Sequence, residues 1–254
     1  MLCILATNVK IKLRIMKIFS MTFLLVMVIC SNACRPFGKR IKGNGNQVTE
    51  TRDISSADHL SVRGDFDVVL TKGATGVKVT ADENLMKYIQ IKMDDNLLVI
   101  SSEDRINLSS ENKITVNIST PEIIEANVLG SGNITSNDKF VVGDKMTLKT
   151  TGSGDINLVV NCPDVKAGIT GSGNINLSGE TRNLKVSITG SGNFRGQDLK
   201  SENADVSIAG SGDATVYADV NLKAGISGSG EIKYRGNATV SKRISGSGSV
   251  TAIN

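Results

Sequence analysis

Apolar and polar side chains alternate with a period of two through the carboxyl-terminal half of the 254-residue chain. The alternation is organised around seven Gly-Ser-Gly triplets, which begin at residues 130, 152, 171, 190, 210, 228 and 246. Counting from the first Gly as zero, positions −6, −4, −2, +4 and +6 hold 31 apolar residues in 35 places, whereas positions −5, −3, −1, +3 and +5 hold 2 in 35. Because a helical period of 3.6 would mix these two sets, the pattern predicts strands with one buried and one exposed face.

Successive triplets begin 18 to 22 residues apart, a spacing typical of repeat proteins. Two all-β arrangements fit this spacing. In a parallel β-solenoid each copy forms one rung, with its triplet at a corner and equivalent residues stacked about 4.8 Å apart. In the alternative, each triplet closes an antiparallel hairpin. The recurrence of isoleucine at position −2, as in Ile169, Ile188 and Ile208, favours the solenoid because stacked positions share one environment.

The segment 49–120 continues the alternation without the triplets and is predicted to be an amino-terminal β region. An imperfect copy of the repeat surrounds Gly64, with Val62 before it and Phe66 and Val68 after it. We expect this region to seal one end of the repeat stack, which residues 121–254 form, since solenoids need caps over their open edges.

The amino terminus has the layout of a secretory signal: a basic start, an apolar stretch at 18–30 and small residues before a cysteine. Residues 1–33 resemble a bacterial lipoprotein signal, with Met16 as an alternative start and Cys34 as the lipid-attachment residue; a plain cleaved signal peptide is the alternative. Residues 34–48, rich in Gly, Asn and cations, are predicted to be a flexible tether.

Removal of the signal changes the charge of the chain. Four of the 29 basic residues and none of the 25 acidic residues precede Cys34, so the chain from Cys34 onward is formally neutral. We therefore expect no nucleic-acid partner, since such proteins carry a basic surface. Cys162 is then the one cysteine besides Cys34, and we expect it to pack as a small apolar residue.

The sequence offers little for catalysis, and we predict no catalytic residue, metal or cofactor. His59 is the single histidine, which excludes a cluster of histidine ligands. Asp65 and Asp67 share one strand face. They could form an acid–base pair, but the simpler interpretation is that they are solvated acids. Position +3 is mostly Asn or Asp, which indicates turn chemistry or a polar ladder rather than a row of calcium sites.

Several segments together resemble one known family. The sequence Gly-Ser-Gly-Asn-Ile occurs at 130–134 and 171–175, and Phe-Asp-Val-Val-Leu occurs at 66–70. With these motifs the chain, from about residue 54 to 254, resembles the auto-transporter-adhesin head GIN domain family. The resemblance implies a right-handed parallel β-helix-like fold and a bacterial envelope location, and it brings no catalytic residues.

The combined expectation is a non-enzymatic lipoprotein of the bacterial envelope, anchored at the outer membrane, on either its periplasmic or its surface side. Its polar solenoid surface would serve adhesion, binding or scaffolding, with a glycan or a protein as ligand. Two alternatives remain: a glycan-active β-helix enzyme, and an accessory protein of envelope stress or assembly. The enzyme requires clustered acids, at least one with a raised pKa.

Overall fold

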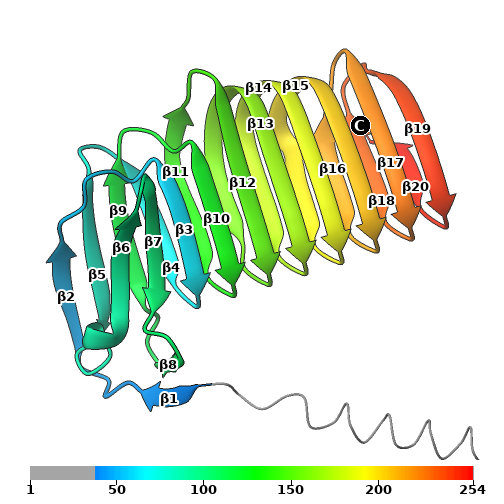
Figure 1. Ribbon diagram of the computed structural model, residues 1–254. Coiled ribbons are helices and arrows are strands. Elements are labelled where there is room, and N and C mark those ends of the chain that lie inside the picture. Colours follow the sequence, from blue (N-terminus) through cyan, green and yellow to red (C-terminus); the bar gives the residue numbers. More distant parts are fainter. Residues whose placement is uncertain (1–37, 254) are drawn as a thin grey trace, which may run out of the picture. The chain divides into compact units, whose positions relative to one another are not determined.

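The computed structural model describes residues 38–253, and residues 40–254 form the compact unit considered below (Figure 1). The predicted signal sequence and Cys34 lie outside the described residues. The described part of the chain is all-β, with one short 3₁₀ turn, η1 (Met86–Tyr88).

The repeats build two parallel sheets that meet at the Gly-Ser-Gly corners. Strands that enter the corners form sheet I, which contains in spatial order β7 (Leu97–Ser102), β3 (His59–Gly64), β10 (Glu125–Gly130), β12 (Lys145–Gly152), the second halves of β13 (Ile156–Gly171), β14 (Asn174–Gly190) and β15 (Asn193–Gly210), then β17 (Asn221–Gly228) and β19 (Thr239–Gly246). Strands that leave the corners form sheet II, which contains β9 (Thr115–Thr120), β4 (Asp67–Lys72), β11 (Asn133–Val141), the first halves of β13, β14 and β15, then β16 (Asp213–Tyr217), β18 (Glu231–Arg235) and β20 (Ser249–Ala252).

The pairing confirms the parallel solenoid and excludes the hairpin arrangement. Ile188 pairs with Ile169 on one side and with Ile208 on the other, in parallel sense. Equivalent residues of successive copies are therefore in register along sheet I, whereas sheet II has register shifts after Thr135 and after Asn176. At six of the seven corners, two N–H groups donate to one carbonyl of the preceding rung. For example, the backbone N–H groups of Ser191 and Gly192 donate to the Gly171 carbonyl at 2.9 and 3.0 Å.

The predicted apolar positions form the core between the sheets. Ile169, Ile188 and Ile208 are each 1% exposed. Side-chain sizes compensate within a rung: the glycine at 196 leaves room for the Phe194 ring, which a Cβ at 196 would contact at 2.5 Å. In β19, which has one neighbouring strand in sheet I among the described residues, Ile244 is 38% exposed.

The parallel stack begins earlier than the expected boundary at residue 121. Strand β3 pairs with β10 so that Gly64 aligns with Gly130, and β4 pairs with β11. Strands β7 and β9 add one more rung on the other side of β3 and β4. The boundary is displaced because Gly64 fills the corner position although no full triplet surrounds it.

Antiparallel strands extend the two sheets at this end. Strand β6 (Ile89–Asp94) pairs with β7, β5 (Gly76–Asp82) pairs with β9, and β2 (Gln47–Arg52) pairs with β5. Strands β1 (Lys39–Lys42) and β8 (Ile106–Ser109) form a separate two-stranded sheet. Residues 34–48 are predicted from the sequence to be a flexible tether, but β1 and the start of β2 lie within this range. These residues form strands because Ile41 and Val48 pack against the core.

Asp82 joins the amino-terminal segments at the end of β5. Its carboxylate is 1% exposed and accepts hydrogen bonds from Ser110 Oγ at 2.5 Å and from Asn112 Nδ2 at 3.2 Å. These hydrogen bonds, with one from the Gly45 backbone, lower the pKa of Asp82 although its burial opposes this. A Cβ at Gly43 would collide with this carboxylate, so the glycine lets the chain pass beside it.

We expect Asp82→Asn to destabilise the fold by about 1–3 kcal/mol at pH 7, because the amide cannot accept all the hydrogen bonds of the carboxylate. The folded-state pKa of Asp82 is lower than its ordinary value of 3.8, so its contribution is complete above that value and is lost as the pH falls through the folded pKa. Denaturant unfolding between pH 2 and pH 7 should show that the difference in free energy of unfolding between the wild type and Asp82→Asn becomes smaller toward pH 2. Asp53→Asn, at an exposed position, is the control, and a pH-independent difference for Asp82→Asn would contradict the assignment.

Candidate functional site

The outer surface of sheet I carries rows of side chains, one per rung, because the odd-numbered repeat positions point away from the core. Rows −3 and −1 hold mostly small residues such as Ser187, Ser207 and Thr189. Rows −7 and −5, where the strands begin, hold amides and lysines. An open groove of about 860 Å³ follows these two rows across six strands, from Lys145 on β12 to Ser241 on β19.

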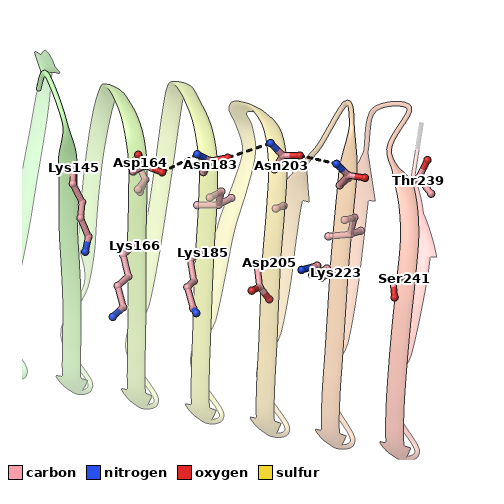
Figure 2. Close-up of a pocket in the computed structure, with 15 residues that line it drawn as sticks. Lys145, Asp164, Lys166, Asn183, Lys185, Asn203, Asp205, Lys223, Thr239 and Ser241 are labelled. Atoms are coloured by element: carbon pink, nitrogen blue, oxygen red, sulfur yellow. Dashed lines mark hydrogen bonds between the residues drawn. The ribbon is translucent and has the colours of Figure 1, made fainter.

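Row −7 of this groove is an amide ladder, formed by Asp164, Asn183, Asn203 and Asn221. Asn183 Nδ2 donates to Asp164 Oδ1 at 2.8 Å, Asn203 Nδ2 to Asn183 Oδ1 at 3.1 Å, and Asn221 Nδ2 to Asn203 Oδ1 at 2.9 Å (Figure 2). Each amide nitrogen uses one of its two N–H groups in the ladder. The bonds fix the side chains in register and leave a second donor on each amide.

Four lysines, Lys145, Lys166, Lys185 and Lys223, also line the groove and are named here the groove lysines. The side chains of Lys145, Lys166 and Lys185 lie along consecutive strands (Figure 2). All four are exposed, and within residues 38–253 none has a carboxylate partner within 4.0 Å. Asp164 and Asp205 are the acidic residues of the groove, so its lining carries an excess of positive charge.

Sheet II carries a second ladder at position +3, in which side-chain oxygens again accept hydrogen bonds from the next rung. The backbone N–H of Asn174 donates to Asp155 Oδ1 at 2.8 Å, and Asn193 Nδ2 donates to Asn174 Oδ1 at 2.9 Å. This agrees with the polar ladder expected for the Asn and Asp residues at +3. Over the described residues, no group of three or more His, Cys, Asp and Glu side chains is placed to hold a metal ion.

In the structure Asp65 and Asp67 do not form the acid–base pair considered above. Asp67 Oδ2 lies 2.6 Å from Lys113 Nζ, and Asp67 Oδ1 accepts from Asn133 Nδ2 at 2.7 Å. The same interaction raises the pKa of Lys113. Both oxygens of the Asp67 carboxylate are therefore engaged by neighbouring side chains.

Asp58 and Asp82 have altered pKa values, and neither is altered as a general acid would require. Burial raises the pKa of Asp58, but hydrogen bonds, chiefly from Ser56 Oγ, outweigh it and leave the pKa lowered. The pKa of Asp82 is also lowered. His59 Nδ1 lies 3.4 Å from Asp58 Oδ2 and 3.2 Å from Asn96 Nδ2, at the start of β3. Glycan-cleaving enzymes raise the pKa of one carboxyl, which is the opposite of the direction found for Asp58 and Asp82.

Cys162 is buried between the sheets at 1% exposure. Burial is the main cause that raises the pKa of its thiol, and its Sγ–H donates to the Asp164 carbonyl at 3.3 Å. A protonated, buried thiol is a poor nucleophile. In the part of the chain that the structure describes, no helix has the length and apolar character to cross a membrane.

The groove on sheet I was not identified from the sequence, although its signal is present in the repeat alignment. Position −7 is Asn in three successive copies, and position −5 is Lys in three of four copies between residues 166 and 223. An alignment of the outward positions of the repeats shows both the asparagine row at −7 and the lysine row at −5. The lysine at 145, which lies at position −7, extends the groove by one rung.

Solved structures share this architecture. A putative adhesin from Bacteroides fragilis is 21% identical with a TM-score of 0.78, over 84% of this chain and 100% of that chain. A putative lipid binding protein from Parabacteroides distasonis is 26% identical with a TM-score of 0.68, and a putative adhesin from Parabacteroides merdae is 25% identical with a TM-score of 0.63, each over 85% of this chain and 100% of its own. Among curated proteins, none matches the chain.

A family model described as "Putative auto-transporter adhesin, head GIN domain" matches residues 58–238. The matched range begins at the rung formed by β3 and β4, includes the strands that line the groove from β12 to β17, and ends just before β19. An adhesin description points to a protein of the cell envelope or cell surface and to a binding role. The chain belongs to the auto-transporter-adhesin head GIN domain family.

Proposed function

We propose that the protein is a non-catalytic, lipid-anchored adhesin of the bacterial outer membrane that binds a glycan or a protein along the groove of sheet I. The observation that carries this proposal is the groove itself, which crosses six rungs and is lined by hydrogen-bonded amides and exposed lysines. A surface of this kind suits an extended ligand, because successive rungs place polar and charged side chains at aligned positions.

The role of the groove can be tested with a bulky substitution. Asp205 lies at its centre and is exposed, so Asp205→Trp should obstruct the groove without disturbing the core. Thr215 is an outward residue of β16 on sheet II, and Thr215→Trp is the matched control. The full-length protein, purified in detergent, would be screened on arrays of glycans and of envelope proteins. The proposal requires a ligand that the wild type and Thr215→Trp bind and that Asp205→Trp does not.

The proposal includes lipid attachment at Cys34, which would hold the protein at the membrane by its amino-terminal segment. We expect Cys34→Ala to lose labelling by radioactive palmitate in growing cells and to leave the membrane fraction, since a lipidated terminus is what holds the protein there. Cys162→Ala, which removes the buried thiol, is the control and should label normally. Palmitate labelling of Cys34→Ala at the wild-type level would refute the anchor.

A further inference from the structure

The donors and acceptors of the groove are strongly unequal in number. Each groove lysine offers three N–H donors and no acceptor, and each ladder amide keeps one N–H outside the ladder. The acidic side chains are Asp164, one oxygen of which already accepts from Asn183, and Asp205. A ligand that complements this surface must supply oxygen acceptors and negative charge.

Three of the groove lysines share row −5 and are spaced by the rung repeat, whereas Lys145 lies in row −7 of the rung before Lys166. Lys166 pairs in register with Lys185, and Lys185 with Asp205, which in turn pairs with Lys223. Neighbouring rungs lie about 4.8 Å apart. Like charges at this separation repel each other unless an anion lies between them. The spacing is close to the rise of one sugar unit in an extended polysaccharide, so a polymer with one acid group per sugar would match the row of cations.

We propose that the groove binds a linear acidic polysaccharide, with its carboxylate or sulfate groups on Lys145, Lys166, Lys185 and Lys223. This inference rests on the proposed function and names the ligand class of the same groove. The lining residues favour a polysaccharide over a single-stranded nucleic acid, because none of them is aromatic and stacking of bases on aromatic side chains supplies much of the affinity for single strands. The chain from Cys34 onward is formally neutral, so the attraction is local to the groove.

Polygalacturonate is a suitable probe, since it carries one carboxylate per sugar, and neutral dextran is the control polymer. Titration calorimetry with the full-length protein should show binding of polygalacturonate and not of dextran. Lys166→Gln combined with Lys185→Gln should weaken binding about tenfold, since each exposed ion pair contributes modestly. Lys78→Gln with Lys92→Gln, at exposed positions of β5 and β6, should have no effect.

A gain of affinity provides the sharper test. Asp205→Lys would complete an uninterrupted row from Lys166 to Lys223 and should strengthen polygalacturonate binding about fivefold, a result that misfolding cannot imitate. Raising the salt concentration from 50 to 500 mM should weaken binding in every variant, because exposed charges are screened.

Three outcomes would overturn the proposal. The first is unchanged polygalacturonate affinity in both lysine and Asp205 variants. The second is binding of polyadenylate RNA or of phosphatidylglycerol vesicles that is as strong as the binding of polygalacturonate and depends on the same lysines. That result would assign the groove to another polyanion. The third is an array ligand that Asp205→Trp abolishes but the double lysine variant retains, which leaves the adhesin function intact and removes only the acidic ligand class.

Discussion

Ile188→Asp is expected to destabilise the solenoid by at least about 4 kcal/mol, which is a large part of the stability of a typical domain. Ile188 is 1% exposed and stacks between Ile169 and Ile208. The substitution leaves a void where the isoleucine packed and places a carboxyl group among apolar side chains, where its charged form is strongly disfavoured. Unfolding in guanidinium chloride, followed by circular dichroism, measures the loss.

The control lies one residue away. Ser187 occupies position −3 on the exposed surface of sheet I, so Ser187→Asp should change the free energy of unfolding by less than about 0.5 kcal/mol. Losses of similar size in the two variants would contradict the inside and outside assignment of the whole sheet, because the repeat gives every copy the same alternation.

The sequence predicts the core of this fold well, because the buried positions are a local property of each repeat. Alternation assigns Ile169, Ile188 and Ile208 to one face whichever way the strands pair. It cannot separate the solenoid from the hairpin arrangement, because both keep the even positions on one side. Only the non-local register, Gly190 against Gly171 and Gly210, distinguishes them.

The amino-terminal region is less predictable for the same physical reason. Strands β7 and β9 follow β3 and β4 in sequence, but their rung precedes that of β3 and β4 in the stack. The strand at 39–42 looks like a tether in sequence, since Gly, Asn and cations surround a single buried contact through Ile41. Both arrangements depend on which distant strands pair with each other. The alternation of apolar and polar residues within a segment contains no information about that pairing.

The candidate site was missed for a different reason. Burial selects recognisable residue types at inward positions, whereas outward positions tolerate most polar residues. The lysines at 166, 185 and 223 therefore look like ordinary solvated residues until the register places them in one groove beside the amide ladder. What distinguishes them in the structure is their shared row in one groove, beside the amide ladder.

The corners explain why glycine flanks the serine in every triplet. At Gly171 the backbone φ is +114°, a conformation that side chains with a Cβ rarely adopt. A Cβ there would also lie 2.5 Å from the Gly152 carbonyl oxygen of the preceding rung. That carbonyl accepts hydrogen bonds from Ser172 and Gly173, so it cannot move away without loss of the rung contact. The serine between the glycines is exposed.

Gly171→Ala is therefore expected to cost about 3–5 kcal/mol, from the backbone strain and the steric overlap together. Two alanine substitutions serve as controls. Ser172→Ala removes an exposed hydroxyl from the same corner and should be nearly silent. Gly225 lies within β17, where a Cβ would be 3.8 Å from the Val206 carbonyl oxygen, so Gly225→Ala should be neutral or stabilise by up to about 1 kcal/mol. Thermal and denaturant unfolding of the three variants gives the comparison, and a Gly171→Ala protein as stable as Gly225→Ala would show that the rungs can separate at the corner.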